Sequence, residues 1–147
     1  MKTKEFTLYS KAFKHTEDMP EKYTLEGQNI IPSLNWENAP FDTKSFALIV
    51  DDPDNLQGMM CHWLIKNIPK DTTSIEEGSK PSGIEIENSF GKKNYVGPST
   101  EYKTHRIFFR LYALNTEDFE ANDMNHFYRE VERHKLDEAT LMGKITK

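Results

Sequence analysis

The sequence predicts a mainly β single domain with a few short helices, the main one near the C-terminus. Three observations predict it: short apolar runs rich in strand-forming residues, turn signals between those runs, and helical periodicity confined to the end of the chain. At 147 residues, one domain over residues 1–147 is the simplest organisation, and it could bury about 68% of the surface that the unfolded chain exposes. No internal repeat or linker divides the chain.

Four segments are expected to form strands. Phe6 and Leu8 alternate with polar residues, Phe46 to Val50 reads FALIV, Trp63 to Ile68 reads WLIKNI, and Arg106 to Leu114 reads RIFFRLYAL. Turn signals fall between them at Asn38-Ala39-Pro40, Asp52-Pro53-Asp54, Gly78, Pro81 to Gly83 and Gly97-Pro98. This spacing is typical of a β-sandwich with long connections.

Helical signals come late in the chain. Asp123 can cap a helix whose apolar residues Phe127 and Val131 lie four positions apart on one face. The segment from Leu136 to Leu141, before Gly143, is interpreted as a second helical piece.

Composition excludes several classes of protein. The chain is 36% hydrophobic and 29% charged with a net charge of -5, so a basic surface for nucleic acid is not expected. No apolar run approaches the roughly 18 residues of a membrane span, and the N-terminal MKTKEFTLYS lacks the apolar core of a signal peptide. The single cysteine excludes an internal disulfide, and a cytoplasmic location is expected. No cofactor is expected.

Chemistry-bearing residues gather in DDPDNLQGMMCHW, Asp51 to Trp63, between two predicted strands. His62 and the distant His105 each adjoin a strand and could converge with Asp52. Histidines held by a carboxylate favour the imidazolium form, and two imidazoliums would offer donors to an anion. The residues alone leave bland alternatives open: a simple turn at Asp52-Pro53-Asp54, and histidines that are hydrogen-bonded at the rim of the sandwich.

Neighbouring residues receive structural interpretations. Asp54 is expected to pair with Arg106 across two loops. Cys61 is expected to be a buried spectator, because adjacent strand residues point to opposite faces and His62 is then poorly placed to activate the thiol. His15, His126 and His134 are assigned no role, Trp36 and Trp63 are expected to be core or pocket-wall residues, and the acidic TEDFEANDMN is expected to be a solvated face.

Four segments together resemble a known family: EGQNIIPSLNWENAP, KSFALIVDDPDN, HWLIKNIP and NYVGPSTEYKTHRIFFRLYAL, in this order. The chain is similar to the phosphatidylethanolamine-binding protein family, in its bacterial Raf-kinase-inhibitor-like branch. The resemblance implies a β-sandwich with a small surface pocket for phosphate or a phospholipid head group. It places Asp52, His62 and His105 in that pocket.

Gly97 and Pro98 are expected to form a turn beside the pocket. Gly97 allows close approach of the backbone, and its amide is a candidate donor to an anion, although a turn without a ligand role explains the pair equally well.

The sequence departs from the family pattern at three places. Leu56 replaces a proline after DPD, and Ser99 and Thr100 stand where the GP segment continues into prolines. Ile107 replaces the tyrosine after HR, and this departure is expected to matter most, because isoleucine cannot donate a hydrogen bond to a bound anion.

The expected function is a small soluble binding protein for an anionic or phosphorylated group, which by family analogy regulates a protein kinase or another partner. The alternative is a metal-dependent hydrolase in which Asp52, His62 and His105 hold a divalent metal. The chain has no HExxH motif, which favours binding over catalysis. A lipid carrier is a third possibility, although a head-group pocket need not hold acyl chains.

Overall fold

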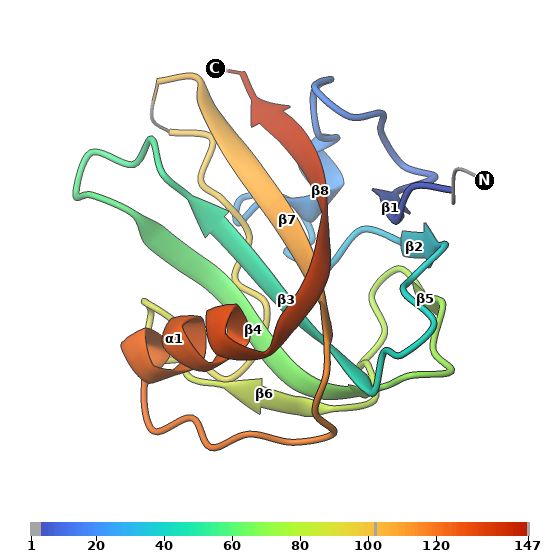
Figure 1. Ribbon diagram of the computed structural model, residues 1–147. Coiled ribbons are helices and arrows are strands. Elements are labelled where there is room, and N and C mark those ends of the chain that lie inside the picture. The colour runs from blue at the N-terminus through green and yellow to red at the C-terminus, as the bar shows by residue number, and fades with distance from the viewer. Residues whose placement is uncertain (1–3, 102, 147) are drawn as a thin grey trace.

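The computed structural model describes residues 4–101 and 103–146, which form two antiparallel sheets and one α-helix (Figure 1). The mainly β prediction is therefore confirmed. The ends of the predicted domain and the start of the N-terminal stretch, residues 1–3 and 147, lie outside the described residues. Within the described residues, no helix has both the length and the apolar character needed to cross a membrane.

The larger sheet has five strands in the order β6-β4-β3-β7-β8. Its strands are β3 (Ser45–Asp52), β4 (Met60–Pro69), β6 (Ile84–Ile86), β7 (His105–Leu114) and β8 (Lys135–Ile145). Three of the strands predicted from apolar runs are thus confirmed, each slightly longer than the run that indicated it.

The smaller sheet, at the right in Figure 1, has the order β1-β2-β5. Its strands are β1 (Thr7–Tyr9), β2 (Leu34–Glu37) and β5 (Ser74–Ile75), and a short 3-10 helix, η1 (Glu21–Tyr23), follows β1. The helix α1 (Met124–His134) packs on the opposite face of the larger sheet. The Asp123 carboxylate accepts a hydrogen bond from the His126 amide at 2.8 Å, which confirms the predicted cap.

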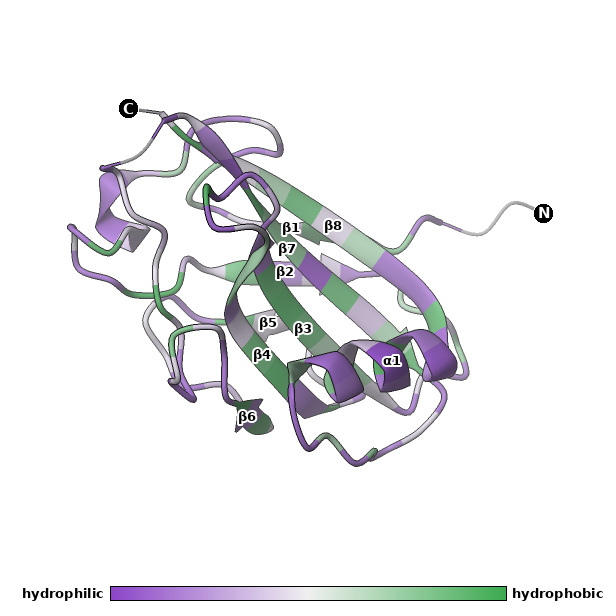
Figure 2. Cartoon of the chain, turned by 90° about the vertical axis from the view of Figure 1, so that its left-hand side faces the viewer, coloured by the Kyte–Doolittle hydropathy of each residue, from purple (hydrophilic) through white to green (hydrophobic). Residues whose placement is uncertain are grey.

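Side-chain alternation along β3 separates two apolar cores. Phe46, Leu48 and Val50 face the smaller sheet and join the main core, whereas Ala47 and Ile49 face α1. Figure 2 shows the apolar strands enclosed in the middle and the polar outer side of α1 turned toward solvent. Because both faces of β3 are covered, all of its residues are buried.

The second helical piece predicted at Leu136 to Leu141 is wrong, because these residues belong to β8. β8 begins directly after α1, with no residues between them. It pairs with β7 along its whole length, so that Lys135 lies opposite Leu114 and Ile145 lies opposite His105. The alternation Ala139, Leu141, Ile145 on the core face is a strand period. Pairing with a long neighbouring strand therefore overrides the local helical propensity.

A β-bulge in β4 sets the positions of the candidate site. Val50 pairs with Trp63 and Asp51 pairs with Cys61, so His62 is one extra residue without a partner on β3. Trp63 faces the main core and Cys61 faces the α1 side. The bulge lets His62 follow Cys61 and still lie on the same side of the sheet as its neighbour Trp63.

Candidate functional site

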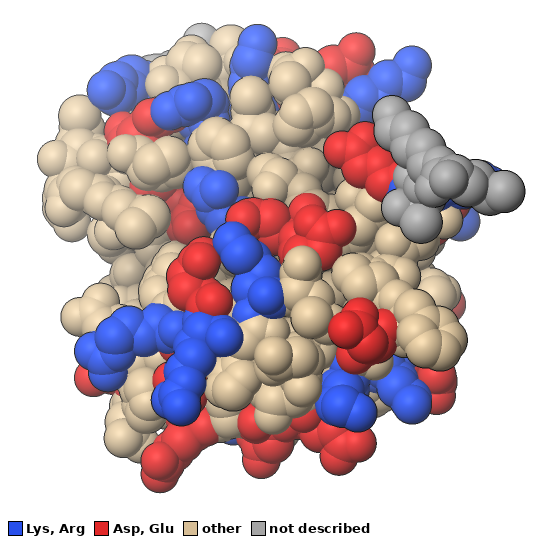
Figure 3. Space-filling view, in the orientation of Figure 1, with Lys and Arg blue, Asp and Glu red and all other residues tan. Residues whose placement is uncertain are grey.

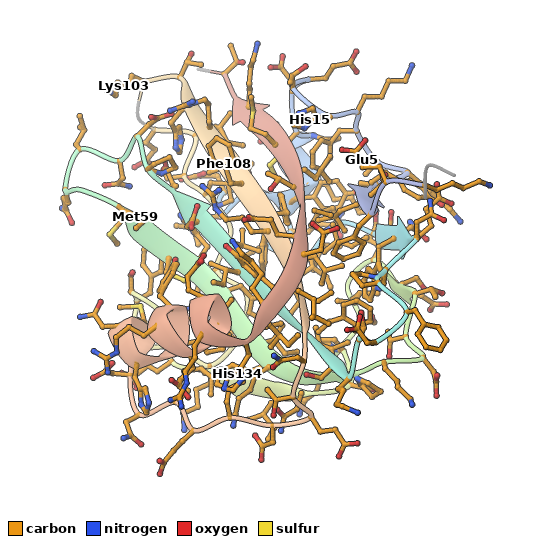
Figure 4. All side chains as sticks on the ribbon, viewed as in Figure 1. Glu5, His15, Met59, Lys103, Phe108 and His134 are labelled. Carbon is orange, nitrogen blue, oxygen red and sulfur yellow. The ribbon has the colours of Figure 1, made fainter. Side chains whose placement is uncertain are left out.

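Three adjacent strands place Asp52, His62 and His105 around one cavity of about 300 Å³. Asp52 ends β3, His62 lies at the bulge of β4, and His105 begins β7. All three side chains are at most 3% exposed. The three residues chosen from the sequence thus meet at one end of the sheet. In Figure 4, Met59 in the β3–β4 hairpin and Lys103 before β7 lie at that end.

Asp52 and His105 form a buried ion pair. The Asp52 Oδ2 lies 2.5 Å from His105 Nδ1, and the Ser99 carbonyl lies 3.0 Å from His105 Nε2. A carboxylate and a carbonyl both accept, so both ring nitrogens donate and His105 is an imidazolium. The hydrogen bond to Asp52 raises the pKa of His105, although burial opposes this. The other Asp52 oxygen accepts the Asp54 amide at 2.9 Å.

His62 has the opposite protonation state. Its Nδ1 donates to the Val96 carbonyl at 2.6 Å, and the Val96 amide donates back to the His62 carbonyl at 3.1 Å. Burial lowers the pKa of His62, which keeps the ring neutral. The remaining nitrogen, Nε2, is buried and has no hydrogen-bond partner within the described residues. In the neutral ring Nε2 is an acceptor, so it lacks a hydrogen-bond donor opposite it.

The expectation of two imidazoliums is therefore wrong. His105 is cationic, but both of its donors are already engaged, whereas His62 is neutral and offers one unused acceptor. The reason is that only His105 touches the Asp52 carboxylate, while Val96 gives His62 a neutral partner. A ligand at this cavity gains most by bringing a proton to Nε2, because burying an unpaired polar atom costs about 1–3 kcal/mol.

The cavity wall is acidic and partly apolar. Glu26 accepts hydrogen bonds from the Ser99 hydroxyl and the Thr100 amide, each at 2.7 Å. Burial opposes ionisation of Glu26, but these hydrogen bonds outweigh it and lower its pKa. Leu25 and Phe90 line the cavity while remaining 46% and 38% exposed, and the Phe90 ring lies 5.0 Å from the His62 ring. The cavity thus suits a ligand with positive and apolar parts besides its proton-bearing group.

The sequence missed these wall residues. Leu25 and Phe90 come from loops outside the four family segments, and Glu26, although it opens EGQNIIPSLNWENAP, is assigned no role there. The alternating pattern of a strand would have been a signal, but loops lack it.

Gly97 lines the cavity, but its amide is not available to an anion. The Gly97 amide donates to Asn29 Oδ1 at 2.6 Å. A Cβ at this position would lie 2.5 Å from the Tyr23 carbonyl oxygen, so glycine is needed for close packing. The Pro98 carbonyl accepts the Leu25 amide at 2.9 Å. Both residues shape the loop, which agrees with the turn interpretation, and the Gly97 amide is already engaged by Asn29.

Only one of the departures from the family pattern lines the cavity. Ser99 does so, whereas Ile107 is fully buried in the main core, two residues along β7 from His105. Alternation places Ile107 on the same face of β7 as His105, but its side chain packs in the main core and does not line the cavity. The effect of Ile107 on anion binding therefore stays a prediction. Leu56 is 69% exposed in the β3–β4 hairpin.

Asp54 and Arg106 form the predicted pair. Asp54 Oδ2 accepts from Arg106 Nε at 2.8 Å, and Oδ1 accepts from Nη2 at 2.9 Å. These hydrogen bonds from Arg106 lower the pKa of Asp54 to about 2. The pair joins the β3–β4 hairpin to the start of β7, so it fixes the two loops that hold Asp52 and His105.

Cys61 is buried against the α1-side core, away from His62, as expected for a spectator thiol. Burial raises the pKa of Cys61 to about 12, so the thiol stays protonated. The other histidines make local hydrogen bonds: His15 accepts the Met142 amide, His126 the Asn122 amide, and His134 pairs with Asn115. Trp63 belongs to the main core.

Metal ligation would need a rearrangement of this site. Within the described residues, no group of three or more His, Cys, Asp or Glu side chains is placed to hold a metal ion. Asp52 and His105 bind each other, and His105 has no nitrogen left over. His62 Nε2 is the nitrogen of this cavity that a metal could reach without breaking a hydrogen bond.

Comparisons with known proteins agree on one group. A family model described as "Phosphatidylethanolamine-binding protein" matches residues 9–146. A "UPF0098 protein" from Methanothermobacter thermautotrophicus is 42% identical, over 92% of this chain and 95% of its own. A crystal structure titled as a phosphatidylethanolamine-binding protein homologue, CT736 from Chlamydia trachomatis, has a TM-score of 0.88 at 30% identity, over 97% of both chains.

E. coli YbcL, titled a member of the mammalian PEBP family, has a TM-score of 0.89 at 27% identity, over 98% of this chain and 99% of its own.

Proposed function

The chain belongs to the phosphatidylethanolamine-binding protein family, and from this premise we propose that the cavity of Asp52, His62 and His105 binds a small phosphorylated group. The preferred form is a zwitterionic head such as phosphorylethanolamine, rather than inorganic phosphate. By family analogy, occupancy of the cavity regulates a kinase or another protein partner in the cytoplasm.

The observation that carries the proposal is the unpartnered Nε2 of His62. A phosphate monoester has a second pKa of about 6, so near neutral pH it readily shares one proton with a neighbouring base. Bound beside Nε2, the ester and the imidazole hold that proton between them, and the buried acceptor gains its missing partner. Binding therefore requires one proton on the ester or on the ring.

The acidic wall of the cavity favours a zwitterionic ligand over a simple anion. Glu26, Asp52 and Glu101 line the cavity together with the single imidazolium of His105, so a doubly charged phosphate meets net negative charge. An ammonium group on the same ligand compensates this repulsion and can pair with Glu26. The exposed faces of Leu25 and Phe90 can cover the ethylene carbons.

Thermal unfolding tests the proposal at pH 6 and pH 8 with phosphorylethanolamine, inorganic phosphate and zinc, each at matched ionic strength. A ligand that binds only the native state raises the melting temperature by mass action. Phosphorylethanolamine is expected to stabilise more than phosphate, and more at pH 6 than at pH 8. In Glu26→Gln, the advantage of phosphorylethanolamine over phosphate should shrink.

His62→Gln should abolish the stabilisation by phosphorylethanolamine, because glutamine cannot take up the shared proton. His134→Gln is the matched control, since His134 lies at the end of α1 and pairs with Asn115. An unchanged response in His62→Gln would overturn the assignment of the cavity. Stabilisation by zinc alone, stronger at pH 8, would support the metal-dependent hydrolase instead.

A further inference from the structure

A second and larger cavity lies on the other side of the Tyr95–Gly97 segment from the candidate site. Its volume is about 460 Å³, and it lies between the loops of residues 29–31, 78–81 and 93–95. Trp63 and Glu85 complete its wall. Tyr95 lines this cavity and Gly97 lines the first one, so the two are neighbours although the described lining residues of each are different.

Part of the wall of this second cavity is aromatic. Trp63 and Tyr95 pack edge to face, with ring centroids 6.0 Å apart and an interplanar angle of 85°. Their polar atoms are already satisfied, because Trp63 Nε1 donates to Glu85 Oε2 and the Tyr95 hydroxyl donates to the Tyr23 carbonyl, both at 2.8 Å. Trp63 and Tyr95 are only 1% and 6% exposed, so the half-buried Ile30 and Pro81 supply more of the apolar surface that a ligand could contact.

The rim of the second cavity is positive. Lys80 and Lys93 come from loops on two sides of it, and both are exposed. In the part of the chain that the structure describes, neither ammonium group pairs with a carboxylate. Glu85 is the acidic residue of the wall, and one of its oxygens accepts from Trp63. The charge is thus opposite to that of the first cavity, whose wall carries Glu26, Asp52 and Glu101.

We propose that this second cavity binds a small organic anion with a flat apolar body, of the aryl carboxylate class. The carboxylate lies between Lys80 and Lys93, and the ring lies over the apolar wall beside Tyr95. Two exposed lysines give charge recognition, and the apolar wall selects a flat body over a hydrated inorganic anion. This site is independent of the phosphate proposal, because it uses neither His62 nor His105.

Titration of the full chain with 2-naphthoate, followed by amide NMR, tests the inference. The neutral analogue 2-naphthalenemethanol is the control ligand. Shift changes are expected at Ile31, Gly78 and Tyr95. The double variant Lys80→Met/Lys93→Met keeps most of the apolar stems and should weaken naphthoate about tenfold, since each exposed ion pair is a modest contribution. The alcohol should bind this variant and the wild type equally.

The double variant Lys11→Met/Lys14→Met is the matched control, because both lysines are exposed and remote from this rim. It should bind naphthoate as the wild type does. His62→Gln should also leave naphthoate binding unchanged. Equal affinity in Lys80→Met/Lys93→Met, or loss of naphthoate binding in His62→Gln, would overturn the second site, as would shift changes confined to the first cavity.

Discussion

Asp51 and Asp52 are neighbours on β3, yet they lie on opposite faces of the larger sheet. Both are buried, at 1% and 0% exposure, and each meets a cation, Arg110 or His105. Arg110 Nε approaches both Asp51 oxygens at 3.2 Å, and the Tyr128 hydroxyl donates to Asp51 at 3.2 Å. Beside Asp52, by contrast, a cavity opens and His62 keeps an unpaired nitrogen.

The difference teaches that a buried, paired carboxylate is not in itself a sign of a binding site. Burial raises the pKa of Asp51 despite the nearby Arg110, so this group is also electrostatically unusual. Its surroundings nevertheless close over it: Arg110 also stacks on Phe108, with 4.5 Å from the guanidinium carbon to the ring centroid. Phe108 lies on the face of β7 turned to the viewer (Figure 4). Figure 3 shows cations and anions interleaved on that face.

The largest expected effect is the loss of unfolding free energy when Asp51, the carboxylate on the closed face, is removed. Asp51→Ala leaves Arg110 and the Tyr128 hydroxyl without their partner, and it should cost about 2–3 kcal/mol of unfolding free energy, the range for lost hydrogen bonds to a charged group. Urea unfolding followed by circular dichroism measures this, with the exposed Asp71→Ala as control. The response to phosphorylethanolamine should persist under conditions where the variant is folded. Loss of that response would mean that the two faces are not separate.

The next largest effect is expected at Asp52, on the face of the sheet where the cavity opens. Asp52→Asn replaces a charged acceptor of His105 by a neutral one and should cost about 1–2 kcal/mol. Unlike Asp51→Ala, it should also lower the pKa of His105 and remove the response to phosphorylethanolamine. Histidine NMR titration and thermal unfolding report these two changes. A His105 pKa that stays raised would show that Ser99, rather than Asp52, holds the proton.

His62 and His105, the two histidines of the cavity, should change the stability of the protein in opposite directions as the pH rises. The pKa of His105 is raised, so its stabilising contribution is complete below the unfolded pKa of about 6.5 and is lost as pH rises through the folded value. The pKa of His62 is lowered, so its contribution is present above about 6.5 and is lost as pH falls through the folded value.

Unfolding free energies between pH 5 and pH 9 measure these contributions. His62→Gln should flatten the acid side of the profile, and His105→Gln should flatten the alkaline side. The same side flattened by both variants would contradict the opposite protonation states.

The smallest effect concerns the exposed pair that borders the site. A double-mutant cycle of Asp54→Asn and Arg106→Gln should give a coupling smaller than any effect above, because solvent screens the pair. Lowering the pH to 2 should weaken the coupling, since about half of the Asp54 carboxyl groups are protonated at a pH equal to their pKa of about 2. A coupling larger than the cost of Asp52→Asn would show that the hairpin tether, rather than the buried pair, holds the site together.

The sequence predicted the strands with apolar runs and the meeting of Asp52, His62 and His105, because strand ends and motif resemblance both point there. It did not predict β8, whose fate depends on pairing with β7. Nor did it predict the opposite charge states of the histidines, since a pKa depends on partners such as Val96 and Ser99 that come from distant loops. The short strands β2, β5 and β6 carry too few residues for a periodic signal.

The extra residue in β4 also has a consequence for insertions and deletions. Because strand side chains alternate, the count of residues between the β3–β4 turn and Trp63 decides which face each of them meets. Deleting one residue here would restore an even pairing and leave a single side chain opposite Val50, so either the imidazole or the indole would lose its place. Relatives that shorten this stretch by one residue should therefore keep the core or the binding cavity, but not both. Length variation is far better tolerated in the hairpin loop, where Leu56 and Met59 are exposed.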